Sequence, residues 1–323
     1  MPENITINNY RSRARGYFLG QSHPAALAFF RIAIGSLAII HWAILFRYAP
    51  LLYGEYGIIK PEISRAIRQV MGNNMIRWDL VSWTEILAAV FHTTEQQGIL
   101  VFLCVYGAFL LFLTTGFLTT FSALVCWFLN LVLLNSYQLT SYGYDMFMSN
   151  CLLLLVFMPT AARLSFDRLL FRRRSSETLA GFSFFTLRIF LCVIYFFSGI
   201  NKMVSHQWWT GEAIWRACMQ PPFHSFDLGF LARVPVLLTV GSIFTLLVET
   251  FYPLLIHIPA TRRVILLMAI AMHLSIAMLL GLWFFSGIMI AMNLTLYLGS
   301  THAPPHSVSH KEPTPPAYSH SAS

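Results

Sequence analysis

Charged side chains are scarce in this sequence. Only 11% of its 323 residues are Asp, Glu, Lys or Arg, whereas a soluble domain carries roughly 25%. Hydrophobic residues make up 57%, and the mean hydropathy is +0.63. Because so few charges cannot cover a water-facing surface, the composition predicts an integral membrane protein surrounded by the lipid bilayer. The net charge of +8 fits basic loops beside an anionic leaflet. No basic stretch is long enough for a nucleic-acid patch, so we expect no nucleic-acid partner.

Cysteine pairs with redox or metal-ligand spacing are also missing. The five cysteines form no CxxC pair, and four of them lie inside apolar runs, where cysteine acts as a small hydrophobic residue. Cys218 alone falls in a predicted loop. The sequence contains no nucleotide-binding loop and no HExxH or GxSxG motif. We therefore expect neither a disulfide framework nor a metal site.

Long apolar runs are what the sequence does contain. Eight of them approach the roughly 20 residues that cross a bilayer core. They span residues 25–47, 98–115, 117–136, 145–162, 183–203, 235–258, 264–282 and 284–300. The pattern predicts an all-α fold, a polytopic membrane helical bundle of about eight spans. It leaves open whether the last two spans are separate or form one re-entrant element. The domain covers residues 25–300, between a basic segment, 1–24, and a Pro-, Ser- and His-rich tail, 301–323, which we expect to be disordered.

Basic clusters orient the predicted bundle. Arginines lie before the first span, between residues 163 and 174, and at Arg262 and Arg263 after the sixth span. Eight spans place all three clusters on one face, which the positive-inside rule indicates is cytoplasmic. We therefore expect a multi-pass cell-membrane protein with both termini in the cytoplasm. The segments predicted outside are 48–97, 137–144 and 204–234. Helical periodicity from Pro61 to His92 predicts one or two helices on the outer membrane face.

Ionisable residues within the predicted spans are candidate functional groups, because a charge in lipid needs a partner or a task. They are Arg31, His41, Asp145, Arg188, Lys202, Glu249 and His273. Lys202 is predicted at the outer end of the fifth span. It is either an anchor that extends to the headgroups or a general base whose amine is freed by burial. The preceding pair Ser198 and Gly199 allows close helix packing, and Trp208 with Trp209 could fold back over the lysine.

The other candidates have structural as well as functional interpretations. His273 lies near the middle of the seventh span, as a core histidine or as a hydrogen-bonding partner of a substrate. Glu249 is too deep to remain charged alone, and we expect a salt bridge with Arg188 or Arg31. Asp145 follows two tyrosines at the start of the fourth span, where a helix cap is the structural interpretation.

These residues resemble a known family. The chain is similar to bacterial proteins that share a transmembrane domain with vitamin K-dependent γ-glutamyl carboxylase, the horizontally transferred transmembrane (HTTM) domain. The resemblance covers residues 25–300. It rests on Arg31, the turn Tyr53-Gly54-x-x-Gly57-x-x-x-Pro61, Asp145 before a span that ends at Pro159, Tyr195 to Lys202 with Trp208, Trp209 and Gly211, Glu249 with Pro253, and His273. The layout also resembles the sporulation-delaying-protein maturation family B, whose members help to produce an exported peptide toxin.

The resemblance implies roles for three residues. In the carboxylase, a lysine after the same small-residue turn acts as the base on a vitamin K hydroquinone, which implies a base at Lys202 and a quinone as a cofactor to test. A later histidine of the carboxylase matches His273. Another of its histidines falls near Asp145, and the first lysine of its pair is replaced by Asn201. The carboxylase has a large lumenal domain with no counterpart here, so we do not expect processive glutamate carboxylation by this chain alone.

Three functions follow as hypotheses. The favoured one is maturation or modification of an exported peptide at an outward-facing pocket formed by Lys202, His273 and Asp145, with a soluble partner protein that holds the substrate. The alternative is a non-catalytic scaffold or an immunity-like binding protein, in which Lys202 is an anchor. The third is a small-molecule transporter, with which Glu249 and His273 are compatible. The sequence does not decide whether the chain is an enzyme.

Overall fold

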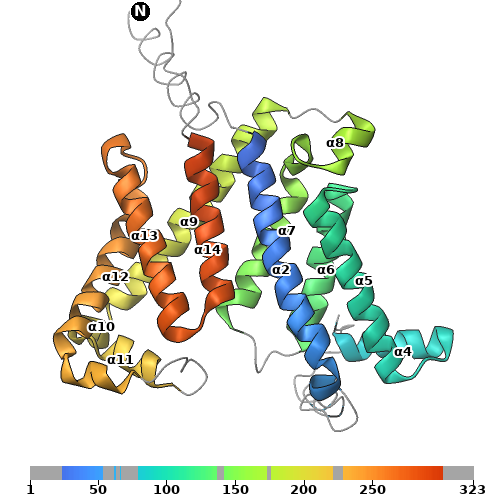
Figure 1. Ribbon diagram of the computed structural model, residues 1–323, viewed down its shortest axis with the longest axis horizontal. Coiled ribbons are helices and arrows are strands. Elements are labelled where there is room, and N and C mark those ends of the chain that lie inside the picture. The colour runs from blue at the N-terminus through green and yellow to red at the C-terminus, as the bar shows by residue number, and fades with distance from the viewer. Residues whose placement is uncertain are drawn as a thin grey trace, which may run out of the picture.

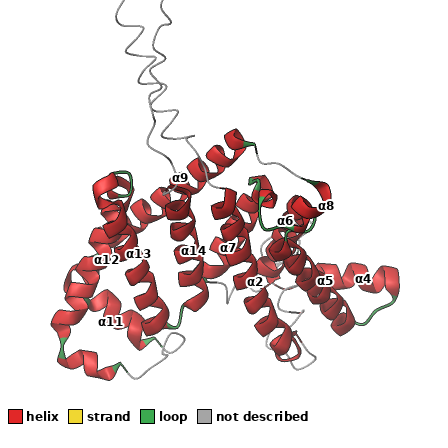
Figure 2. Cartoon of the chain, turned by 45° about the horizontal axis from the view of Figure 1, so that its top comes forward, coloured by secondary structure: helices red, strands yellow, loops and turns green. Residues whose placement is uncertain are grey.

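The structure is a computed structural model that describes residues 24–53, 62, 66, 79–136, 142–172, 176–220 and 228–300. Every regular element in these ranges is a helix (Figure 2). The first half of the chain forms α2 (Pro24–Tyr53), α4 (Leu80–Phe91), α5 (Glu95–Thr115), α6 (Thr119–Ser136), α7 (Gly143–Phe157), the short η1 (Thr160–Ala162) and α8 (Phe166–Phe171). The second half forms α9 (Glu177–Met203), α10 (His206–Thr210), α11 (Glu212–Met219), η3 (Gly229–Arg233), α12 (Pro235–Leu255), α13 (Pro259–Leu280) and α14 (Trp283–Ser300).

Each of the eight predicted spans coincides with one helix. Six helices are long and apolar enough to cross a membrane, namely α2, α5, α6, α9, α12 and α13, and α7 and α14 are shorter apolar helices. The prediction of an all-α polytopic bundle is therefore confirmed. The question of the last two spans is also answered, because α13 and α14 are separate helices. They are joined at Gly281, whose φ of 70° suits a residue without a side chain.

The connection with α8 and the turn from α12 to α13, which carry two of the predicted arginine clusters, lie at one end of the bundle (Figure 1). Arg216 of α11 and Arg233 of η3 belong to the connection at the opposite end. Figure 1 shows the start of α2, the segment around α8 and the turn from α12 to α13 together at that end, with α4, α10 and α11 at the opposite end. This arrangement is the one that eight alternating spans require. The arginines of the first 23 residues are outside the described residues, as is the predicted tail from residue 301.

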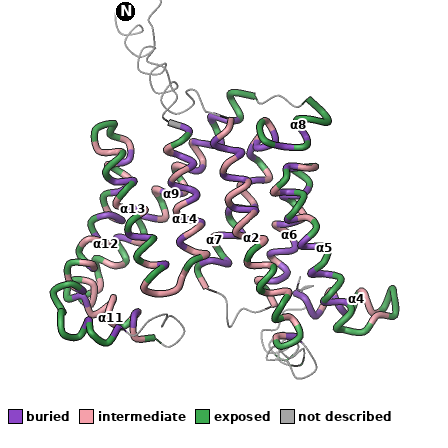
Figure 3. Tube along the Cα trace, viewed as in Figure 1, coloured by how far each residue is buried: buried purple, intermediate pink, exposed green. Residues whose placement is uncertain are grey.

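The interior is formed where the helices face one another. Figure 3 shows buried residues on the facing sides and exposed residues on the outer sides. Many of the exposed residues are large and apolar, such as Leu100, Leu237 and Leu267, which are 50%, 55% and 66% exposed. A soluble protein rarely exposes such a continuous apolar surface. The outer sides of these helices therefore fit lipid chains.

Arg31 of α2 is completely buried, and it fastens the segment that follows α7. Its guanidinium donates to the carbonyl oxygens of Thr160, at 2.7 Å, and of Leu164. Asp167 of α8 fixes the same region, because its carboxylate accepts from the Thr119 backbone N–H at 2.8 Å and from the Thr119 hydroxyl at 2.7 Å. Buried charges that are hydrogen-bonded in this way support the fold rather than a reaction.

The predicted interfacial helix is represented by α4, which lies across the end of the bundle in Figure 1. Asp79 caps the helix by accepting from the Ser82 N–H at 2.8 Å, and the Leu80 N–H donates to the Ser136 hydroxyl at 2.7 Å. The Trp83 ring packs against aromatic rings of α5 and α6. Most of the stretch from Pro61 to residue 78 lies outside the described residues.

The segment after α9 differs from the predicted outer loop 204–234. Short helices α10 and α11 pack against the first half of α12, where the Thr239 hydroxyl donates to the Thr210 carbonyl at 2.9 Å. Gly211, with a φ of 84°, allows this contact, because a Cβ there would lie 2.6 Å from the Thr239 nitrogen. Cys218 is in α11 and fully buried rather than in a loop, and all five cysteines are free thiols. Part of this region, 221–227, is outside the described residues.

Gly199 sets how closely α9 approaches α12. A Cβ at this position would lie 2.8 Å from the Thr250 backbone nitrogen and 3.0 Å from its Cα, distances that require the backbone to move. The predicted close packing at Ser198 and Gly199 is therefore confirmed.

We expect Gly199→Ala to destabilise the protein by about 1–3 kcal/mol, the usual cost of overpacking, despite the better helix propensity of alanine. Gly241→Ala is the matched control on α12, because its Cβ would meet only the flexible end of Ile214 at 3.3 Å. It should leave stability unchanged or slightly raised. Thermal unfolding of both variants in detergent measures the difference. Equal midpoints for the two variants would contradict the close approach of α9 to α12.

Candidate functional site

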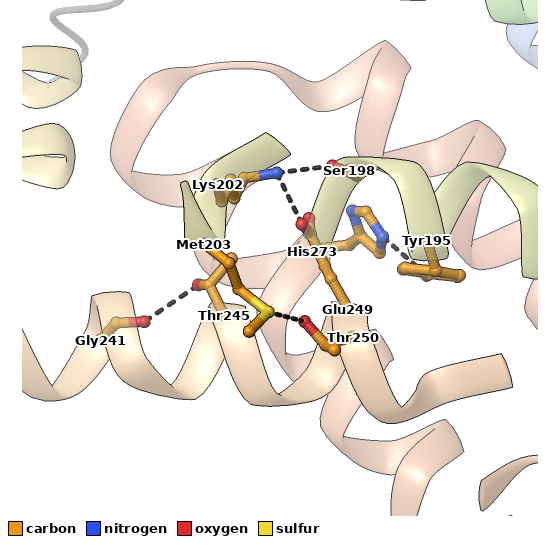
Figure 4. A network of polar contacts seen from close by, with 9 residues as sticks. All are labelled: Tyr195, Ser198, Lys202, Met203, Gly241, Thr245, Glu249, Thr250 and His273. Carbon is orange, nitrogen blue, oxygen red and sulfur yellow. Dashed lines mark hydrogen bonds and ion pairs between the residues drawn. The ribbon is translucent and has the colours of Figure 1, made fainter. Parts of the chain in front are cut away.

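The candidate site lies along one face of α9. Tyr195, Ser198 and Lys202 are three and four residues apart, so their side chains point to the same side of the helix. That side faces α12 and α13, which contribute Glu249 and His273 (Figure 4). Three helices thus bring five polar side chains together.

Lys202 is held in a salt bridge. Its Nζ donates to Glu249 Oε2 at 2.6 Å and to the Ser198 hydroxyl at 2.5 Å. The Trp208 ring covers the ammonium, with its centroid 5.1 Å from Nζ, a distance that suits a cation–π contact. The side chains are 20% exposed for Lys202 and 8% for Glu249. The prediction that the tryptophan segment folds back over the lysine is therefore confirmed for Trp208.

The predicted partner of Glu249 was wrong. Neither Arg31 nor Arg188 forms its salt bridge; Lys202 does. The reason is the placement of α9, which ends beside the second half of α12 instead of beside its start. Glu249 comes fourteen residues after Pro235, the first residue of α12, which is about 21 Å along a helix. Lys202 lies in the last turn of α9, at the end of its span as predicted, and α10 and α11 continue beyond it.

His273 is joined to α9 through a second set of hydrogen bonds. Its Nε2 lies 2.9 Å from the Tyr195 hydroxyl, and the Asn293 amide nitrogen donates to the same hydroxyl at 3.0 Å. The Tyr252 hydroxyl in turn donates to Asn293 Oδ1 at 2.7 Å. Among the described contacts of the Tyr195 hydroxyl, Nε2 of His273 is the acceptor available to its proton, so we assign the hydroxyl as the donor. The ring proton of a neutral His273 is thereby assigned to Nδ1.

That Nδ1–H is the one polar atom of this arrangement without a partner. His273 is 2% exposed, and its Nδ1 has no hydrogen-bond partner in the structure. Buried donors are nearly always satisfied, so an unpaired one indicates an acceptor that the protein itself does not supply. An oxygen atom of a substrate or of an ordered water is the simplest acceptor of this kind.

Asp145 occupies a different position from Lys202 and His273. It lies in the first turn of α7, where its carboxylate accepts from the Tyr142 backbone N–H at 3.0 Å. This contact is the helix-capping arrangement expected from its sequence position. The described contacts pair Lys202 with Glu249 and Tyr195 with His273, and neither pair includes Asp145. A catalytic role for Asp145 stays a prediction.

Asn293 and Tyr252 are the members of the site that the sequence reasoning missed. Both are uncharged, and a search limited to ionisable residues in spans passes over them. A lone asparagine within the apolar run of α14 was a usable signal, because a side-chain amide in a span also needs partners. Tyr195 was noted in the motif, and its place seven residues before Lys202 puts both on one helix face.

The fold and the site define a class: a multi-pass helical membrane protein with a Lys–Glu salt bridge and a His–Tyr pair enclosed between its spans. The family model of the HTTM domain matches residues 20–300. The chain therefore belongs to the HTTM domain family, as the resemblance in the sequence predicted. No curated protein and no solved structure matches it.

The salt bridge leads to a test of stability. Removing one member of a buried pair leaves an uncompensated charge, so we expect Glu249→Gln to destabilise the protein by about 3–5 kcal/mol. The double variant Lys202→Met with Glu249→Gln should recover much of that loss, since no charge is then left without a partner. Thermal unfolding in detergent measures all variants.

The matched control is Glu212→Gln, which removes an exposed i,i+4 pair with Arg216 at 2.6 Å. An exposed pair contributes about 0–1 kcal/mol, so this variant should be nearly neutral. If the two glutamate substitutions have the same small effect, the Lys202–Glu249 pair is not enclosed as the geometry indicates.

Proposed function

We propose that this HTTM protein matures or modifies an exported peptide at the site formed by Lys202, Glu249 and His273. The unpaired Nδ1–H of His273 is the observation that carries the proposal, because it lies between spans beside a titratable pair. A peptide carbonyl oxygen is an acceptor of the right kind for that donor. Binding there orients a substrate toward Lys202.

Proton transfer within the salt bridge can convert Lys202 into a base. An ammonium ion cannot accept a proton, but Lys202 and Glu249 are joined by a 2.6 Å hydrogen bond. In surroundings of low polarity the desolvation of two charges is costly, which favours transfer of the proton from Nζ to Oε2. The result is a neutral carboxylic acid and a free amine. The amine then takes a proton from the bound substrate, and Glu249 retains the one it received.

The placement of the protein is part of the proposal. Two of the predicted arginine clusters, around α8 and at the turn from α12 to α13, lie at one end of the bundle (Figure 1), and we assign that end to the cytoplasm by the positive-inside rule. The protein is then a cell-membrane protein with both termini inside. The segment with α10 and α11 faces outward, and a soluble partner that presents the peptide docks on that side. Asp145 starts α7 at the same outward end.

A quinone is a cofactor to test. The carboxylase resemblance implies it, and the buried Nδ1–H of His273 fits one carbonyl oxygen of such a ring. A bound quinone supplies redox chemistry that no side chain provides. The roles that we propose for the side chains are the same with or without a quinone. His273 orients an oxygen atom, and Lys202 with Glu249 holds or moves a proton. Solvent extraction of the purified protein shows whether it retains a quinone.

The proposal predicts the effect of two lysine substitutions. Lys202→Ala should abolish the modified or mature peptide even when the amount of protein in the membrane is matched to the native level, a match that is needed because this variant leaves Glu249 without its partner. Lys202→Arg should also abolish this peptide, because a guanidinium keeps the charge but does not give up its proton. Mass spectrometry of secreted peptides from cells with the native, deleted and variant genes measures the product, and the mass difference identifies the chemistry.

Two outcomes would contradict this function. Normal product from Lys202→Ala would remove the lysine from the chemistry. Normal product from Lys202→Arg together with loss in Lys202→Ala would favour the non-catalytic scaffold or immunity-like binder, in which only the positive charge matters. Arg216→Ala, which removes an exposed cation from α11, is the control for a general loss of charge near the site.

A small-molecule transporter is a second candidate, favoured by one specific observation. Two separate sets of polar contacts, Lys202 with Glu249 and Tyr195 with His273 and Asn293, lie between spans that are otherwise apolar. Polar and ionisable side chains between spans line ion and proton pathways in transporters. We expect liposomes that contain the purified protein to hold a proton gradient as well as empty liposomes do. Rapid dissipation that Glu249→Gln abolishes would favour transport over peptide maturation.

A further inference from the structure

A second polar site lies toward the other end of α9. A small, partly open pocket with a volume of about 20 Å³ lies between α9, α13, α14 and the end of α12. Its polar lining consists of Arg188, Arg262, Asn293 and Tyr297, and the remaining walls are aliphatic. Two arginines from different helices thus face one small space between spans.

Arg262 is oriented toward this space by its own backbone contact. Its Nε donates to the Ile256 carbonyl at 3.1 Å, across the turn between α12 and α13. This bond uses only one of the five guanidinium hydrogens, and the two Nη groups keep the planar fork that binds phosphate or carboxylate. Arg188 approaches the same pocket from α9.

The pKa of His257 reflects burial and the positive charge of the two arginines that line the pocket. His257 lies in the turn between α12 and α13, and burial together with the nearby Arg188 and Arg262 lowers its pKa. Both guanidinium groups therefore act on the same small volume. A small pocket lined by two guanidinium groups favours an anion.

The aliphatic walls narrow the class of anion. Leu266 and Leu296 line the pocket beside the arginines. On α13, the neighbouring Val264 and Leu267 are 58% and 66% exposed, and they belong to the apolar surface that fits lipid chains. Two of the pocket's lining residues, Ile256 and Arg262, flank the turn between α12 and α13, which Figure 1 shows at the same end as α8. A basic pocket beside a long apolar surface suits an amphiphile, which has a charged headgroup and apolar chains, better than a free ion.

We propose that this pocket binds the phosphate of an acidic phospholipid, with its acyl chains along the exposed side of α13. Basic pockets between membrane helices are a general way to hold such headgroups. Arg262 and Arg188 contact the phosphate, Asn293 and Tyr297 lie beside the glycerol oxygens, and Leu266 contacts the first part of a chain. The proposal is independent of the peptide chemistry at Lys202.

Native mass spectrometry of the detergent-purified protein tests the site. We expect phosphatidylglycerol to remain bound where phosphatidylcholine does not. Arg262→Gln should weaken retention of phosphatidylglycerol about tenfold, the loss expected for one charge-assisted contact. Arg263→Gln is the matched control, because it removes the same charge from the adjacent, exposed position. It should change retention less than twofold.

A variant that keeps both charges separates binding from folding. Leu266→Trp should fill the pocket and exclude the lipid while the protein elutes normally on gel filtration. Equal retention in Arg262→Gln and Arg263→Gln, or equal retention of the two lipids, would overturn the proposal. Inorganic phosphate at millimolar concentration should not displace phosphatidylglycerol. Displacement by phosphate would assign the pocket to a free anion instead of a lipid.

Discussion

The cost of placing a charge between membrane spans is the constraint on which the rest of this structure depends. Lys202 satisfies it with a carboxylate from α12, a serine hydroxyl one turn earlier and the face of Trp208. These contacts require α9 and α12 to touch, which the missing side chain of Gly199 permits. They also require the chain to turn back after α9, which produces the short helices α10 and α11 against α12.

Arg31 also lies between spans, but its hydrogen-bond partners differ from those of Lys202. This difference distinguishes a structural residue from a candidate catalytic residue. Its guanidinium is completely buried and donates to backbone carbonyls near η1 and α8. Carbonyl oxygens do not exchange protons with an arginine, so this arrangement only fastens the chain. Lys202 instead faces Glu249, a group that can take a proton from it. The difference in partner gives one buried cation a structural role and makes the other a candidate for reaction.

Asn293 connects the two polar regions of the second half of the chain. Its amide donates to Tyr195, which bonds His273, and the same residue lines the pocket with Arg188 and Arg262. The peptide site proposed near Lys202 and the lipid site proposed near Arg262 therefore share one wall.

Composition and periodicity by themselves determined the class, the helical fold and the eight apolar segments, because hydrophobic length is a local property of the sequence. The combination of Arg31, the run from Tyr195 to Lys202, Glu249 and His273 also indicated the HTTM family, and the family match agrees. Only the tertiary structure decided which residues meet. The pairing of Glu249 with Lys202 instead of an arginine, the enclosure of the lysine and the unpaired Nδ1 of His273 depend on helix neighbours and tilt. Contacts between distant segments are set by how whole helices pack, and no local pattern in a single sequence encodes that.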